Sequence, residues 1–303
     1  MESQPETTHT VRTWAGAREA YRSKLLHQAL FDGSVVMDDV LINLHGDEHR
    51  DRRRIENPLF RRDVQLEYER KEFPLILQAA LSPHLKSGRC ELMSFSHQIM
   101  LSLSCVNAGI DRKIGNQEES DRLLALLAEF IEGARIHHYQ GDREKKVSEI
   151  ANAVSAFEDE FVRPSVQRRE AISNDGGVLP RDVLAALVAN TELSIPIMSR
   201  EVAFYLTAGA STSAVALTNT IHNLLSWLES NPNDRYRLIE DQSFVRQCIL
   251  ETLRLSPISP IGGRRATEDF QLADGTKVRS GDRVDIDIEA ANRDKTIFGA
   301  TAD

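Results

Sequence analysis

The sequence has few of the residues that mark several protein classes. Aromatic residues make up 6% of the 303 residues, and the 10 prolines and 16 glycines follow no triplet period. The low aromatic share argues against an aromatic-rich β-sandwich, and the missing period excludes a collagen-like chain. With 41% hydrophobic and 27% charged residues, the chain can bury a substantial core. The composition therefore favours a helical globular protein.

Cysteine is also scarce. Cys90, Cys105 and Cys248 are odd in number, far apart and without CxxC spacing, which argues against disulfides and a structural zinc site. The first 15 residues are polar and have no apolar core, so they do not form a secretory signal. Reduced thiols and the missing signal together predict a cytoplasmic protein.

Positive charge does not dominate the chain. Its 37 basic and 46 acidic residues give a net charge of −9, which disfavours general binding to nucleic acids. Charge is absent altogether from residues 202–228, a run long enough for a bilayer. Its many Ser, Thr, Asn and His side chains suit a helix through a protein interior better than one facing lipid. We therefore expect a buried helix and no membrane contact.

The pattern along the chain predicts a mainly α fold with a small β-sheet region. Residues 1–13 read as a frayed terminus, and residues 14–32 have the composition of a helix. Helical patterns recur over residues 64–161, and a striped helix is expected over residues 243–255. Alternating apolar residues over 270–288 then predict strands. Without repeats or a clear linker, residues 1–303 are expected to form one domain.

Two charged residues of the striped helix lie close to its apolar side. Glu251 and Arg254 are three residues apart and share one helix face, so they should pair. Taken alone, such a pair reads as an exposed ion pair contributing a few tenths of a kcal/mol. Its sequence context changes that interpretation.

The context is a series of motifs in a fixed order: a basic helix start at residues 49–54, AGASTS at 208–213, ETLR at 251–254, RRATED at 264–269 and AANRD at 290–294. Together they resemble the cytochrome P450 superfamily, in particular its soluble bacterial members, from about residue 41 to the C-terminus. The resemblance implies the mainly helical P450 fold and a haem b cofactor. The early part of that fold's first sheet and helix is expected to be missing, so the fold is incomplete at both ends.

The resemblance assigns roles around the oxygen-binding face of the haem. Ala208 and Gly209 would let the backbone of the helix approach the flat cofactor, and Thr212 would hydrogen-bond to bound dioxygen or to a water that protonates it. In this family the residue before the threonine is usually acidic, whereas this chain has Ser211. A serine holds water but cannot serve as a carboxylate reservoir, so proton delivery is expected to be weakened or rerouted.

Cations for the haem propionates would come from His49 and Arg53, which helical spacing places on one face, and from Arg264. Arg54 and Arg265 are the alternatives one residue away. The basic cluster at residues 50–54 could equally be a solvated face or dock an acidic partner such as a ferredoxin. By resemblance, Glu251 and Arg254 form a buried network, whose disruption would cost about 3–5 kcal/mol.

The iron ligand of the family is not evident in the sequence. The resemblance implies a cysteine thiolate in a glycine-flanked loop after the AANRD segment, and no such loop occurs before Asp303. The three cysteines read as small buried or half-buried residues, so no metal ligand is assigned. The chain as given is therefore expected to be truncated and to lack activity.

The leading hypothesis is a haem-thiolate monooxygenase that inserts one oxygen atom from O2 into a small apolar substrate, with electrons from a ferredoxin-type donor. An alternative is a degenerate, non-catalytic P450-like protein that binds small molecules, with which Ser211 is consistent. A nucleic-acid binder built on the basic residues 50–62 is disfavoured by the acidic net charge.

Overall fold

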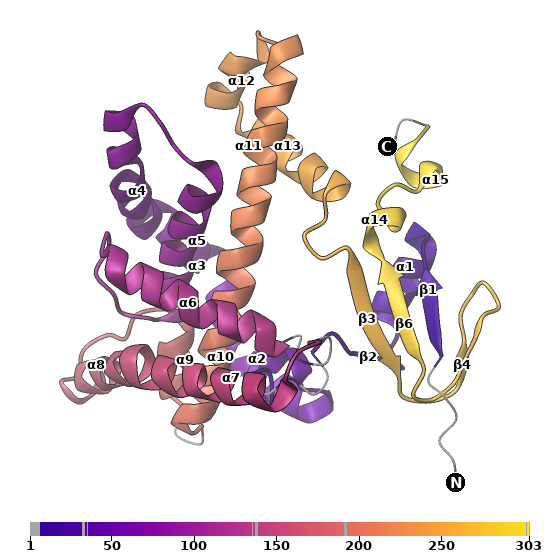
Figure 1. Ribbon diagram of the computed structural model, residues 1–303, viewed down its shortest axis with the longest axis horizontal. Coiled ribbons are helices and arrows are strands. Elements are labelled where there is room, and N and C mark those ends of the chain that lie inside the picture. Colours follow the sequence, from indigo (N-terminus) through magenta and orange to yellow (C-terminus); the bar gives the residue numbers. More distant parts are fainter. Residues whose placement is uncertain are drawn as a thin grey trace. The chain divides into compact units, whose positions relative to one another are not determined.

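The computed structural model describes residues 7–31, 34, 36–134, 136, 139–190, 193–300 and 302. The chain divides into two compact units, each described here by itself (Figure 1). Unit 1 comprises Met1–Asp32 and Ala216–Asp303, and unit 2 comprises Gly33–Val215. The expected single domain stays a prediction. Within the described residues, no helix combines the length and apolar character that crossing a membrane requires.

Unit 2 is built of helices, as the recurring helical patterns predicted. Its α-helices are α2 (Gly46–Glu56), α3 (Arg62–Glu67), α4 (Phe73–Ser87), α5 (Leu92–Ala108), α6 (Gln117–Ala134), α7 (Arg143–Phe157), α8 (Arg163–Asn174), α9 (Val183–Val188) and α10 (Ile195–Leu206). Between them lie two 3₁₀ turns, η1 (Leu41–Asn43) and η2 (Asn57–Phe60), and three π turns, η3 (Tyr68–Glu72), η5 (Glu158–Val162) and η6 (Thr207–Ser211).

The core of unit 2 forms where the apolar stripes of these helices meet. Leu123 and Leu127 of α6 are buried, as the leucine-rich pattern predicted. Phe130 of α6 and Phe157 of α7 are fully buried, and their ring centroids lie 5.3 Å apart in an edge-to-face arrangement. The helical-bundle prediction for this part of the chain is therefore confirmed.

A buried ion pair joins α8 to the start of α9. Arg169 donates to both carboxylate oxygens of Asp182 at 3.2 and 2.7 Å, and to Asp111 at 2.9 Å. Asp182 also caps α9 by accepting from the Ala185 amide at 2.7 Å. Gly109 ends α5 at a φ of +88°, and a Cβ there would lie 2.3 Å from the Asp182 carboxylate. Only glycine fits this contact, so α5 ends here.

Unit 1 contains a four-stranded sheet in the order β1-β6-β3-β2. Its strands are β1 (Thr8–Val11), β2 (Leu26–Gln28), β3 (Ile261–Ala266) and β6 (Arg283–Asp287), with β4 (Phe270–Gln271) and β5 (Lys277–Val278) forming a separate hairpin. β1 runs parallel to β6, whereas β3 is antiparallel to both β6 and β2. Along β6, Val284 and Ile286 are fully buried between half-buried neighbours, so the predicted alternation is confirmed.

Unit 1 contains one longer helix, α13 (Gln242–Leu255), and several short helices. The short helices are α1 (Trp14–Arg22), α12 (Asp234–Glu240), α14 (Ile288–Ala291) and α15 (Lys295–Phe298). The unit boundary falls within α11 (Thr212–Ser230). The predicted helix over 243–255 is confirmed by α13, and the one over 202–228 by α10, η6 and α11 together. The expected burial of that second helix is wrong for α11, where Leu225 and Trp227 are 58% and 50% exposed.

Two expectations for the N-terminal region are wrong. Residues 8–11 are not frayed, because they form β1 and pair with β6, and the Asp282 carboxylate accepts from the Thr7 amide at 3.2 Å and contacts His9 at 3.0 Å. The helix expected up to residue 32 ends at Arg22, since Ser23 is extended and the chain enters β2. Residues 1–6 and 32 lie outside the described part of the chain. An N-terminal helix and two strands therefore do belong to the sheet region.

Candidate functional site

The uncharged run changes helix type at its most distinctive residues. Ala208, Gly209 and Ser211 lie in the π turn η6, and Thr212 begins α11. The Thr212 hydroxyl donates to the carbonyl oxygen of Ala208 at 2.5 Å. A π turn inside a long helix widens the backbone, and such turns occur often at functional sites. The structure therefore gives the motif a local geometry that its composition did not predict.

The two sides of this turn have different surroundings. Ala208 and Thr212 are exposed, Ser211 is half-buried, and Ala210 is buried in the core of unit 2. A Cβ on Gly209 would lie 2.8 Å from the hydroxyl oxygen of Ser104 in α5, so this glycine permits close packing of η6 against α5. The expected approach of a cofactor to Gly209 stays a prediction. The open side of the turn is the side that carries Ala208 and Thr212.

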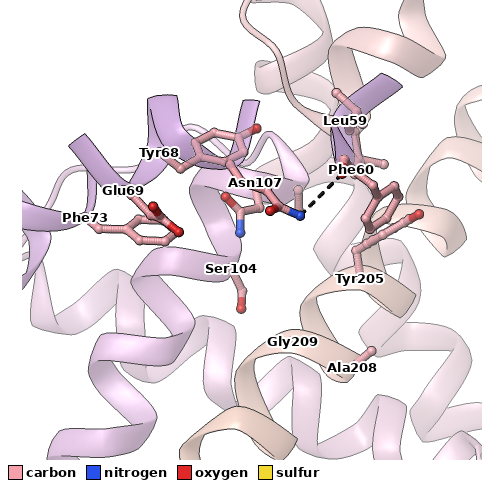
Figure 2. Close-up of a pocket in the computed structure, with 13 residues that line it drawn as sticks. Leu59, Phe60, Tyr68, Glu69, Phe73, Ser104, Asn107, Tyr205, Ala208 and Gly209 are labelled. Carbon is pink, nitrogen blue, oxygen red and sulfur yellow. Dashed lines mark hydrogen bonds between the residues drawn. The ribbon is translucent and has the colours of Figure 1, made fainter. Parts of the chain in front are cut away.

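A pocket of about 470 Å³ adjoins this turn, within the usual size range of small-molecule sites. Figure 2 shows Phe60 and Tyr205 on one side of it and Tyr68 and Phe73 on the other. The ring centroids of Phe60 and Tyr205 lie 6.3 Å apart. Its floor and polar edges are formed by Ala208, Gly209, Ser104, Asn107, Gln65 and Glu69, with Leu59, Ala108 and Val183 completing the lining. The pocket is therefore mainly apolar and aromatic.

Helix α2 carries the predicted His49 and Arg53, both of which are partly exposed. The Arg53 guanidinium lies 4.7 Å from the centre of the Phe60 ring, and no carboxylate of the described residues lies within ion-pair distance of it. Arg54 differs, because its side chain is 80% exposed and pairs with Asp51 at 3.3 Å. Of the two alternatives, Arg53 is therefore the one without a carboxylate partner among the described residues, and its contact with a propionate stays a prediction.

Arg264 lies in β3 of unit 1. Its guanidinium stacks 4.7 Å from the centre of the Tyr21 ring and donates to the Gly263 carbonyl at 2.9 Å. Burial lowers the pKa of Arg264, and among the described residues no carboxylate is close enough to offset that burial. Its neighbour Arg265 donates to the Gly281 carbonyl instead. Arg264 is thus a half-buried cation held by Tyr21 and the Gly263 carbonyl, and its contact with a propionate stays a prediction.

The Glu251–Arg254 pair forms as predicted, although it is not buried throughout. Arg254 donates to both carboxylate oxygens of Glu251 at 2.8 and 2.7 Å, which lowers the pKa of Glu251. Arg254 also donates to the carbonyls of Asn292 and Ala302 at 2.8 and 2.7 Å, so ETLR and AANRD meet. The Glu251 side chain is 55% exposed, however. The expectation of a fully buried pair is therefore wrong for Glu251, because solvent reaches this carboxylate, and the expected cost of removing it stays a prediction.

One polar cluster was missed from the sequence. Glu56 at the end of α2 and Glu201 in α10 are completely buried, and Arg52 forms an ion pair with Glu201. The Tyr205 hydroxyl donates to Glu56 at 2.5 Å. The i,i+4 spacings of Arg52 with Glu56 and of Glu201 with Tyr205 were the available signal. Both pairs were overlooked because the basic cluster was interpreted as a surface.

The cysteines are poorly suited to bind iron. Cys105 is buried and Cys248 is half-buried, as expected, but Cys90 is exposed, so the expected burial is wrong for Cys90. Burial raises the pKa of Cys105 to about 11 and also raises that of Cys248, which disfavours the thiolate that a metal requires. In the described ranges there is no group of three or more His, Cys, Asp and Glu side chains that could hold a metal ion. His137 and His138 lie outside those ranges.

The helices of unit 2, the small mixed sheet of unit 1 and the π turn at residues 207–211 define the class of a mainly α fold with a small β-sheet region. The family model of cytochrome P450 matches residues 15–301. The chain belongs to the cytochrome P450 family.

Curated relatives agree with this assignment. The chain is 24% identical over 272 residues to pulcherriminic acid synthase of Bacillus subtilis (strain 168), covering 87% of this chain and 61% of that enzyme. It is 28% identical over 166 residues to cytochrome P450 105A3 of Streptomyces carbophilus, covering 54% of this chain and 39% of the relative. The matches therefore span less than two thirds of these relatives' lengths.

Solved structures show the same fold. P450BioI, in complex with an acyl carrier protein ligated to hexadec-9Z-enoic acid, has a TM-score of 0.74 at 18% identity, with 95% of this chain and 72% of that chain covered. Cyanobacterial CYP120A1 with bound retinoic acid has a TM-score of 0.76 at 18% identity, with coverages of 97% and 69%. At this identity the likeness establishes the fold, and the mainly helical prediction is confirmed.

Proposed function

We propose that unit 2 supplies the oxygen-side wall and a propionate clamp of the haem site of a P450 monooxygenase. The observation that carries this proposal is the open face at η6, where Ala208 and Thr212 are exposed, together with an unpaired Arg53 in the same unit. When bound, haem supplies the iron centre at which one atom of dioxygen enters an organic substrate. The family assignment supports haem as the cofactor.

The chain's own residues fit the acidic edge of a haem. A guanidinium without a carboxylate partner can hold a propionate in two parallel hydrogen bonds, and Arg53 is such a group. His49, one turn earlier in α2, would add a second donor. Arg264 has the same unpaired character in unit 1, and its part in this site is carried over from the family resemblance. The axial thiolate has no counterpart among the three cysteines.

Thr212 would orient and move protons at the oxygen-binding face. Its hydroxyl donates to Ala208 in the structure and keeps acceptor capacity toward the open side of the turn. Ser211 would hold a water beside it, without the carboxylate that the family usually places there. Proton supply would therefore depend on water or on another acid.

The substrate would be a small apolar molecule, and the electrons would come from a ferredoxin-type donor in the complete enzyme. The aromatic lining of the pocket in Figure 2 supports an apolar ligand. Two structural neighbours hold hexadec-9Z-enoic acid and retinoic acid, both largely hydrocarbon. The exposed Arg50 and Arg54 of α2 suit the docking of an acidic partner.

Titration of the full chain with hemin, followed by the Soret band, tests the proposal. Arg53→Leu should weaken hemin binding about 10- to 150-fold, the range of a lost charge-assisted hydrogen bond. Arg54→Leu is the matched control, because Arg54 is exposed and paired with Asp51, and it should change the affinity less than about threefold. Equal affinities of the two variants, or no saturable hemin binding by the wild-type chain, would overturn the proposal.

A further inference from the structure

The cluster between α2 and α10 contains more buried negative than positive charge. Glu56 and Glu201 have no exposed surface, and Arg52 is 9% exposed. Arg52 pairs with Glu201 and also donates to the Asp39 carbonyl at 3.4 Å. Glu201 further accepts from the Leu41 amide at 3.1 and 3.2 Å. Glu201 is therefore well compensated, whereas Glu56 is not.

Glu56 has only one strong partner. The Tyr205 hydroxyl donates to its Oε2, while its Oε1 is buried and has no hydrogen-bond partner in the part of the chain that the structure describes. A buried carboxylate oxygen without a donor is costly when ionised and much less costly as an acid. Burial beside Glu56 also raises the pKa of Tyr205, so this hydroxyl stays protonated and acts as a donor.

The surrounding elements supply little further compensation. Burial raises the pKa of Glu56, and this effect exceeds the lowering by the Tyr205 hydrogen bond and by the charges of Arg52 and Arg53 on α2. On the other side of Glu201, Arg200 is engaged with the Asp38 carbonyl and the Asp39 carboxylate at 2.8 and 3.3 Å. The segments η1, η2 and α9 contain no titratable side chain. Two buried carboxylates thus share one ion-paired arginine.

We propose that Glu56 and Glu201 hold one proton between them below neutral pH, and that this shared proton is a latch fastening α2 to α10. Loss of the proton would place two negative charges in one dry cluster and loosen the end of α2. The latch would then make the position of α2, and of the cations that it carries, depend on pH. The inference is independent of haem, because every group in it belongs to the chain.

The pH range follows from the carboxyl groups. Burial and the charge of Glu56 raise the pKa of Glu201 from 4.5 to about 7. The folded protein keeps the proton to a higher pH than the unfolded chain does. The proton therefore contributes its full stabilisation of the fold below the ordinary pKa of a glutamate. This stabilisation is lost as the pH rises toward about 7. The folded-to-unfolded ratio should therefore fall by about tenfold per pH unit across this window, the slope for one proton.

Infrared spectroscopy and pH-dependent unfolding of the full chain test the latch. At pH 6 the wild-type chain should show the carbonyl band of a protonated carboxylic acid, and the band should fade as the pH rises through about 7. Glu56→Gln should remove the band and flatten the dependence of stability on pH to less than about threefold per unit. Glu48→Gln, an exposed position on the same helix, should leave both properties unchanged.

Amide hydrogen exchange separates a latch from a purely local titration. In the wild type, the amides in the last turns of α2 should lose more protection with rising pH than the intrinsic change in exchange rate explains. Glu56→Gln should abolish this additional loss of protection. If Glu56→Gln does not fold, Glu201→Gln and the wild-type infrared titration still decide the matter. Absence of the acid band from the wild type, or an equal pH slope in the wild type and a folded Glu56→Gln variant, would overturn the proposal.

Discussion

Replacing Gly209 by alanine tests what this glycine does in the π turn. The new Cβ would lie 2.8 Å from the Ser104 hydroxyl oxygen and 3.5 Å from the Ser104 Cβ. The contact with the hydroxyl oxygen is shorter than van der Waals packing allows, whereas the contact with the Ser104 Cβ is an ordinary one. A second substitution, Ser104→Ala, removes the offending oxygen and keeps the Cβ. Combining the two substitutions therefore isolates one contact between η6 and α5, that of residue 209 with the Ser104 hydroxyl group.

The expected effect has opposite signs in the two backgrounds. Overpacking costs about 1–3 kcal/mol, and exchanging glycine for alanine in a helix gains about 1 kcal/mol. Gly209→Ala alone should therefore lower the free energy of unfolding by roughly 0–2 kcal/mol. In the Ser104→Ala background the same change should raise it by about 1 kcal/mol, since only the ordinary contact remains.

Urea unfolding of the four proteins of this cycle measures the coupling. If Gly209→Ala changes the free energy of unfolding by the same amount in both backgrounds, within about 0.5 kcal/mol, the packing explanation fails. Hemin affinity of the double variant then addresses the other role. The family resemblance predicts that the double variant binds hemin more weakly than Ser104→Ala does, because the Cβ at residue 209 would also crowd the cofactor. An unchanged affinity would leave Gly209 with its packing role alone.

Three further predictions concern the buried groups and the motif pair. Arg169→Met should lower the free energy of unfolding by about 3–5 kcal/mol by leaving Asp182 buried and unpaired, and adding Asp182→Asn should recover part of this loss in urea unfolding. Glu251→Gln should cost about 1 kcal/mol or less because Glu251 is half exposed, and a loss above about 3 kcal/mol would contradict the solvent-exposed geometry. A thiol reagent at neutral pH should modify Cys90 first and Cys105 only on unfolding, as peptide mass spectrometry can show.

The sequence was most informative where one helix provides its own pattern. The uncharged run and the striped helix that ends at Leu255 could be located because periodicity and composition are local properties. Strand β3 was missed, since Gly262, Gly263, Arg264 and Arg265 show no apolar alternation. It is a strand because β6 and β2 pair with it on both sides. Tertiary pairing thus overrode weak local preference.

The candidate site was predictable only in part for the same reason. The order of the motifs identified Thr212 and the basic helix, but it could not show that Arg52 reaches Glu201, 149 residues away. Nor could it show that Glu251 would remain open to solvent while Arg254 is largely covered. Burial and long-range pairing decide these properties, and neither has a signature in a single sequence.

The interleaving of the two units has a consequence for synthesis on the ribosome. Unit 2 is one continuous segment, whereas unit 1 joins Met1–Asp32 to Ala216–Asp303. At translation rates of about 5–20 residues per second, β2 would wait roughly 10–50 s for the end of its partner β3 to emerge. During that interval its edge is a target for chaperones or for other nascent chains. A pause or a stop before residue 283 would leave the N-terminal strands without the partner that closes their sheet.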